Sequence, residues 1–141
     1  MPRLTATQSG TDRHGLPSWI PLVPITLTAA TLGVRAVAIL DSGADITIVP
    51  FEQVAPLGFE WEKLAAGQRS TGAGGSFERR VCPVAITFET WRICDDVEVA
   101  EPGKLPATLL GRVEFFTKFV VRFNWFHNPP TFDIDPVTKR K

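Results

Sequence analysis

At residues 37–44 the chain reads Val37-Ala38-Ile39-Leu40-Asp41-Ser42-Gly43-Ala44. The first four residues are apolar and rich in Val, Ile and Leu, which predicts a buried strand. Gly43 permits a sharp turn after that strand, and the Ser42 hydroxyl can hold the turn through a hydrogen bond. The stretch therefore predicts one carboxylate, Asp41, on a stiff loop that opens to a cleft. The alternative is an aspartate that only caps a turn.

The remainder of the chain reads as short strands separated by closely spaced turn signals, which predicts an all-β barrel or sandwich. Apolar and β-branched residues mark the expected strands at 19–28, 34–40, 46–49, 77–90, 91–100 and 120–124. A single helical turn is expected within residues 51–57. Helical periodicity is convincing only near 112–119.

Length and composition indicate one globular domain. The chain has 141 residues, 44% hydrophobic and 21% charged, with a formal net charge of zero; a nucleic-acid-binding protein would usually show a basic stripe. We expect a flexible leader at 1–17 and a single domain at 18–141. No apolar run is long enough for a membrane span, and the N-terminus lacks a signal-peptide pattern. We expect a cytoplasmic protein without nucleic-acid or membrane partners, although an anchor outside this chain stays an alternative.

Two segments carry a resemblance to a known family. The segment 37–45 is similar to the catalytic segment of the retropepsins, the single-lobed aspartic proteases of retroviruses and their cellular relatives. Ala107-Thr108-Leu109-Leu110-Gly111-Arg112 resembles the second signature of that family, and the order and separation of the two segments also agree. The resemblance implies a closed-barrel-like all-β fold with one short C-terminal helix, a homodimer and a polypeptide substrate. It also implies an alternative for residues 1–17, which could become ordered on dimerisation.

The resemblance also implies roles for the residues of the first segment. Asp41 would be the catalytic acid, one from each chain, because the chemistry needs two carboxylates that share a proton. Ser42 would lock the two turns together across the dimer, and Gly43 would offer its carbonyl to the substrate backbone. Ala44 would lie in the wall of the cleft.

Two further features match family positions. Asp45 and Arg112 would form an ion pair, expected to be partly buried, that orients the active-site loop; the alternative is two unrelated surface charges. The glycine-rich stretch 70–76, with Gly72, Ala73, Gly74 and Gly75 at its tip, would be a flap that closes over a bound peptide. The alternative is an ordinary hairpin loop.

No cofactor or metal is expected. The two His and two Cys residues do not have a zinc-binding spacing, and Cys82 and Cys94 fit buried thiols better than a bridge. The leading hypothesis is thus a homodimeric aspartic endopeptidase. The alternative is a dimerisation or peptide-binding module of the same fold with little or no proteolytic activity, because a fold does not guarantee a function.

Overall fold

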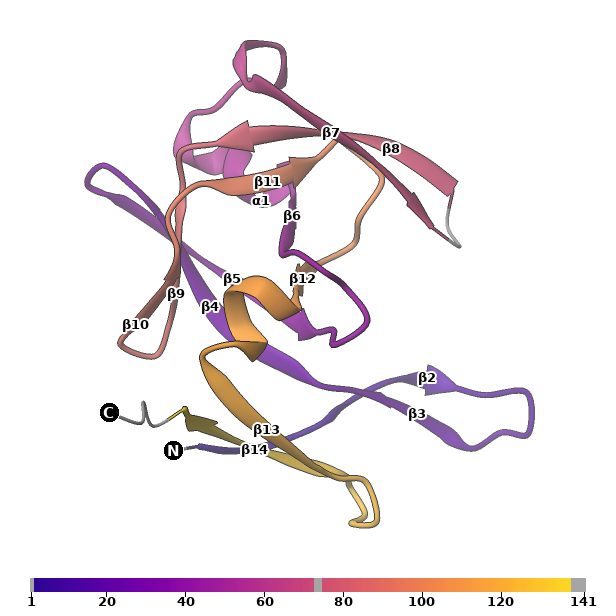
Figure 1. Cartoon of the computed structure of the whole chain (residues 1–141). Helices are drawn as coiled ribbons and strands as arrows, with labels where there is room; N and C mark the ends of the chain where they lie inside the picture. The colour runs from indigo at the N-terminus through magenta and orange to yellow at the C-terminus, as the bar shows by residue number, and fades with distance from the viewer. Residues whose placement is uncertain (1, 73–74, 138–141) are drawn as a thin grey trace.

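The structure is a computed structural model that describes residues 2–72 and 75–137. These residues form a nine-stranded sheet, a three-stranded sheet and a two-stranded sheet. In spatial order the large sheet contains β10 (Trp91–Cys94), β9 (Ala85–Phe88), β4 (Leu22–Ala29), β5 (Leu32–Leu40), β12 (Thr108–Leu110), β6 (Ile48–Pro50), β11 (Val97–Ala100), β8 (Gly75–Cys82) and β7 (Ala65–Gly72). This sheet curls strongly around the core (Figure 1). The all-β class predicted from the sequence is confirmed.

Helical segments are short. They are α1 (Phe51–Val54), η1 (Ala55–Leu57), η2 (Trp61–Lys63) and η3 (Arg112–Phe116). The first two account for the helical turn expected within 51–57, and η3 accounts for the helix expected near 112–119. The η3 turn is wide, because the Thr117 N–H donates to the carbonyl of Arg112, five residues earlier.

The centre of the large sheet brings the two signature segments together. β5 and β12 run parallel, with Leu40 opposite Leu110, and β12 pairs on its other side with β6. The ends of β5 and β12 therefore lie side by side. Asp41 follows one end and Gly111 follows the other, so the sheet register itself brings together residues that are far apart in the sequence.

The core lies inside the curled sheet and beneath η3. Alternating residues of β4, namely Val23, Ile25 and Leu27, are almost fully buried, as expected for a strand with one face against the core. Phe115 of η3 packs on Phe119 with a ring-centroid distance of 4.7 Å. Phe115 also packs on Phe88 of β9, with a ring-centroid distance of 5.5 Å. This second contact fixes η3 against the large sheet.

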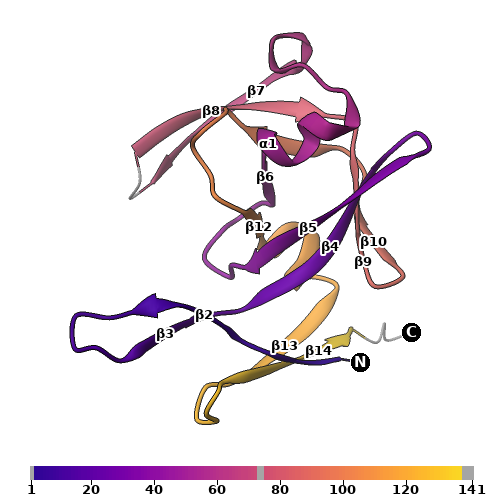
Figure 2. The same cartoon turned by 180° about the vertical axis from the view of Figure 1, so that it is seen from behind.

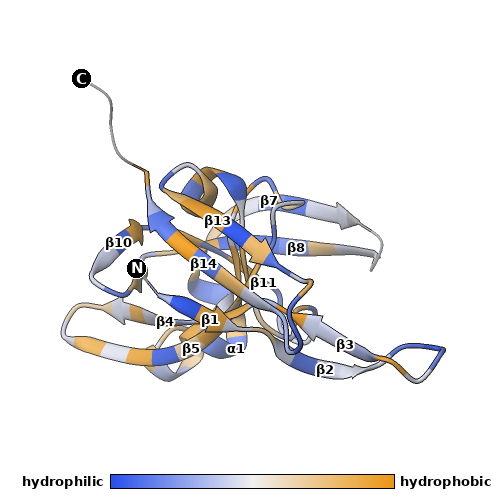
Figure 3. Ribbon diagram, turned by 90° about the horizontal axis from the view of Figure 1, so that it is seen from below, coloured by the Kyte–Doolittle hydropathy of each residue, from blue (hydrophilic) through white to orange (hydrophobic). Residues whose placement is uncertain are grey.

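A smaller sheet lies below the large one (Figure 2). It contains β1 (Arg3–Thr5), β14 (Thr131–Pro136) and β13 (Phe119–Asn124), in that order. Viewed from below, hydrophobic and hydrophilic residues alternate along its strands (Figure 3). In β14 the side chains of Phe132 and Ile134 are fully buried.

Residues 2–17, which the sequence predicts to be a flexible leader, contain β1, β2 (Thr7–Thr11) and the first residue of β3 (Pro17–Ile20) in the structure. β1 pairs with β14, and β2 pairs with β3 in a projecting hairpin. Arg3 forms an ion pair with Asp133 at 2.6 Å. The segment is polar and has no apolar period, so its strands depend on partners that local patterns do not reveal.

Candidate active site

Asp41 lies directly after β5 and is fastened by its own backbone. Its N–H donates to the carbonyl of Leu110 at 3.0 Å, which extends the pairing of β5 with β12. One carboxylate oxygen, Oδ1, accepts the Gly43 N–H at 3.0 Å. The other oxygen, Oδ2, makes no hydrogen bond within residues 2–72 and 75–137, and the side chain is half-buried. One oxygen is thus held in place while the other is available to a proton, a water or a second carboxylate.

Gly111 fits against the loop because it has no side chain. A Cβ placed there would lie 2.4 Å from the carbonyl carbon and oxygen of Ile46. Its N–H donates to the buried Thr47 hydroxyl at 3.0 Å, and the Thr47 N–H donates to Glu114 Oε1 at 2.7 Å. A chain of hydrogen bonds therefore joins the loop that follows Asp41 to η3. Thr47 and Glu114 were not predicted, since neither residue is distinguished by a local pattern.

Arg112 joins the same loop from the outside. Its guanidinium forms an ion pair with Asp45 and donates to the Ser42 carbonyl at 2.8 Å. Its backbone N–H donates to the Ala44 carbonyl at 2.9 Å. The side chains of Arg112 and Asp45 are 52% and 82% exposed in the single chain, so this pair is more exposed than the sequence predicts.

The glycine-rich stretch forms the far end of a long hairpin made by β7 and β8. Gly72 of β7 pairs with Gly75 of β8; Ala73 and Gly74, which belong to the predicted tip, lie outside the described residues. Near the base of the hairpin, a Cβ on Gly67 would lie 2.7 Å from the carbonyl oxygen of Arg79. The hairpin projects from the sheet on the same side as the Asp41 loop (Figure 1).

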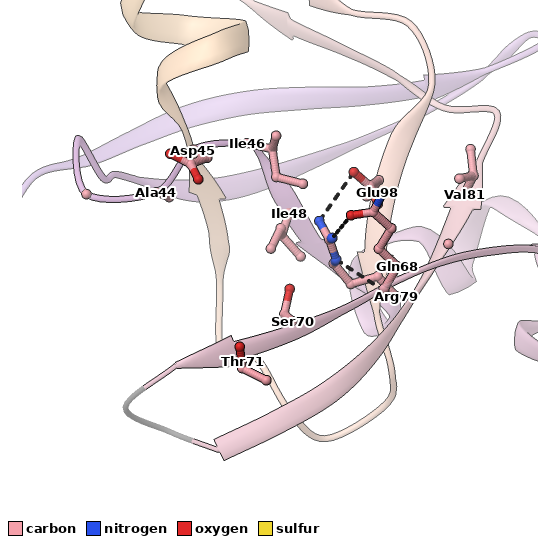
Figure 4. Close-up of a pocket in the computed structure, with 12 residues that line it drawn as sticks. Ala44, Asp45, Ile46, Ile48, Gln68, Ser70, Thr71, Arg79, Val81 and Glu98 are labelled. Atoms are coloured by element: carbon pink, nitrogen blue, oxygen red, sulfur yellow. Dashed lines mark hydrogen bonds and ion pairs between the residues drawn. The ribbon is translucent and has the colours of Figure 1, made fainter.

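A groove of about 730 Å³ separates the loop from the hairpin. Its walls come from the loop that follows Asp41, from β7 and from β8 and β11 (Figure 4). The lining residues are Gly43, Ala44, Asp45, Ile46, Ile48, Gly67, Gln68, Ser70, Thr71, Arg79, Val81 and Glu98. The structure thus places three predicted site residues, Gly43 to Asp45, on one wall and part of the predicted flap on the opposite wall.

The other titratable groups form no second centre in the described part of the chain. No group of three His, Cys, Asp or Glu residues there is arranged to hold a metal ion. Cys82 and Cys94 are both free thiols. Burial raises the pKa of Cys82 to about 12 and that of Cys94 to about 11, so neither is a ready nucleophile. Among these residues, no helix has the length and apolar character to cross a bilayer.

Comparison with known proteins finds matches among structures rather than sequences. No family model matches the chain, and no curated protein sequence matches it. The structure of EIAV protease complexed with the inhibitor HBY-793 is similar with a TM-score of 0.53 and 25% identity, over 66% of this chain and 82% of the viral one. A retropepsin-like aspartic protease from Rickettsia conorii is similar with a TM-score of 0.57 and 14% identity, over 93% of this chain and 88% of the bacterial one.

Proposed function

We propose that this chain, which has the retropepsin-like fold, is an aspartic endopeptidase that acts as a homodimer. The carrying observation is the position of Asp41, fastened by backbone bonds to the second signature segment and followed directly by residues that line the groove. The similarity to proteases from a virus and a bacterium supports this proposal at the level of the fold.

The need for a second chain follows from the chemistry. Two carboxylates about 3 Å apart cannot both ionise, so they hold one proton between them and act as a base and an acid together. The chain has a single Asp-Ser-Gly segment, so the second carboxylate must come from another copy. A twofold dimer that joins the two Asp41 loops is the simplest assembly that supplies it.

In the proposed mechanism, the ionised Asp41 takes a proton from a water molecule, whose oxygen attacks the carbonyl carbon of the scissile peptide. The protonated Asp41 of the other chain donates its proton to the carbonyl oxygen. When the tetrahedral intermediate collapses, the C–N bond breaks and the leaving nitrogen takes the proton that the first Asp41 received from water. One hydroxyl of the intermediate gives its proton to the Asp41 of the other chain, so the product is a carboxylic acid and the dyad again holds one proton. This is general acid–base catalysis without a covalent intermediate.

The β7–β8 hairpin would hold the peptide for this reaction. β7 lies at the edge of the large sheet, and an extended peptide can pair with exposed backbone groups of such a strand. Closure of the hairpin over the peptide would exclude bulk water. The groove between hairpin and loop would then receive side chains of the substrate.

Cleavage of a diverse peptide library, followed by mass spectrometry, tests the proposal. We expect cleavage by the wild type with a bell-shaped dependence on pH, because one carboxylate must be ionised and the other protonated. Asp41→Asn should abolish cleavage while the fold and the dimer persist, as judged by circular dichroism and analytical ultracentrifugation. Asp96→Asn makes the same chemical change at an exposed position and should retain activity.

Three outcomes separate the alternatives. Cleavage that persists in purified Asp41→Asn would refute the role of Asp41. A strictly monomeric protein would refute the paired mechanism. A wild-type dimer that binds peptides but leaves all of them intact at every pH would favour the peptide-binding module of the same fold.

A further inference from the structure

An ion pair lies in the wall of the groove, where it can meet a bound side chain. Arg79 of β8 is only 7% exposed, and its Nη1 lies 3.3 Å from Glu98 Oε2 of β11. The guanidinium also faces Gln68 of β7, with Nε donating to the backbone carbonyl at 3.3 Å and Nη2 donating to Oε1 at 3.5 Å. Figure 4 shows the guanidinium between Glu98 and Gln68.

These contacts leave hydrogen-bonding capacity unused. Charge-assisted hydrogen bonds are usually about 2.7–2.9 Å long, so all three contacts of Arg79 are long. The Glu98 side chain is 28% exposed, and its Oε1 has no hydrogen-bond partner among the described residues. The pair therefore presents N–H donors and a carboxylate acceptor next to one another in the groove.

A carboxamide is the group that matches this arrangement. Its oxygen can accept from the Arg79 guanidinium while its NH2 donates to Glu98 Oε1. A substrate carboxylate would face Glu98, and a substrate ammonium would face Arg79, so either charge would meet repulsion as well as attraction. An apolar side chain would cover the polar atoms of Arg79 and Glu98 without giving them a hydrogen-bond partner. A site built to form hydrogen bonds discriminates against such a side chain.

We propose that this groove selects a glutamine or asparagine side chain of the polypeptide substrate, through Arg79 and Glu98; the inference rests on the proposed protease function. The groove lining includes the residues after Asp41 but not Asp41 itself. The selected side chain thus lies away from the scissile bond. Because the groove occurs twice in a symmetric dimer, the preference appears at equal distances on the two sides of that bond.

Peptide sets that differ only at one position test this selection. Each position is varied among Gln, Glu, Met and Lys, which have comparable length, and kcat/KM is measured for the wild type. We expect Gln to exceed Met by at least about tenfold at one pair of symmetric positions. Equal rates for Gln and Met at every position would overturn the inference while leaving the protease proposal intact.

Variants then trace the preference to the ion pair. Glu98→Gln leaves Arg79 without its carboxylate, so the preference should move from Gln toward Glu at the same positions. The double variant Arg79→Met with Glu98→Leu removes both members of the ion pair, so the net charge is unchanged and neither residue is left without its partner. The preference of this variant should move from Gln toward Met. Glu62→Gln, at an exposed position outside the groove, should leave the preference unchanged. An unaltered preference in both groove variants would overturn the assignment.

Binding separates this inference from catalysis. Asp41→Asn can be titrated with fluorescent peptides of the same set, and anisotropy gives the dissociation constants. Selective binding of Gln peptides without cleavage by the wild type would support the groove assignment and refute the protease proposal. Absence of both binding and cleavage would overturn both.

Discussion

Gly111→Ala should push apart the two segments that hold Asp41. The new Cβ would lie 2.4 Å from the carbonyl group of Ile46, whereas ordinary contact begins at 3.4 Å, so one backbone must move by about 1 Å. Gly111 is buried, and Ile46 is followed directly by the buried residue Thr47 and by β6. The crowded atoms belong to the backbone and not to a flexible side chain. Gly111 has φ −94° and ψ 178°, which alanine adopts without strain, so the crowding alone causes the effect.

The size of the effect follows from three contributions. Overpacking of this kind costs about 1–3 kcal/mol, and loss of the Gly111–Thr47 hydrogen bond costs about 1 kcal/mol more. The lower entropy of alanine in the unfolded chain offsets about 0.4–1 kcal/mol. The free energy of unfolding should therefore fall by about 1–3.5 kcal/mol, which corresponds to a Tm lower by roughly 3–12 °C for a domain of this size.

Urea and thermal denaturation at one fixed protein concentration measure the change, since the stability of a dimer depends on concentration. Gly33→Ala is the matched control, because its new Cβ would meet nothing closer than a Thr28 methyl group at 3.4 Å. The free energy of unfolding of this variant should change by less than about 0.5 kcal/mol. Cleavage by Gly111→Ala should fall further than the loss of folded protein explains. A variant as stable and active as the wild type would refute the close approach.

Three further predictions follow from single side chains. Arg112→Ala should lower the free energy of unfolding by only about 1 kcal/mol, because the ion pair of Arg112 with Asp45 is exposed. A decrease above about 3 kcal/mol in urea denaturation would indicate that a partner chain buries the pair. The hydrogen bond from Arg3 lowers the pKa of Asp133 from 3.8 to about 2. The pair's contribution to stability is therefore present above about pH 4 and is lost as the pH falls toward 2, and an NMR titration of Asp133 with a midpoint near 4 would contradict this. Burial raises the pKa of Cys82 and Cys94, so both thiols should react slowly with Ellman's reagent at pH 7 until the protein is unfolded, and rapid labelling of the native protein would refute their protection.

Most strands of the large sheet could be predicted because their signals are local, although β7 (Ala65–Gly72) and β12 (Thr108–Leu110) are not among the expected strands. In β4 the alternation of Val23, Ile25 and Leu27 directly reports the buried face. β1 and β2 gave no such signal, since β1 is held by a strand about 130 residues away. β14 has only a weak strand signal. Its apolar residues Phe132 and Ile134 alternate with aspartates, and the strand ends at Pro136, which is unfavourable in a strand.

The site shows the same division. Asp41 and its loop are contiguous in the sequence, so a pattern could indicate them. Arg79 and Glu98 meet only because β8 pairs with β11 in one register, and no spacing in the sequence specifies that register. Thr47 and Glu114 meet only once η3 is packed on the sheet, for the same reason.

The fastening of the Asp41 loop by residues far along the chain has a consequence for protein synthesis. Arg112 and Ser42 are 70 residues apart, and ribosomes add about 5–20 residues per second. A nascent chain therefore carries Asp41 for roughly 4–14 seconds before the residues that fix its loop have been added. During that interval the growing chain lacks the residues that hold the Asp41 loop against η3.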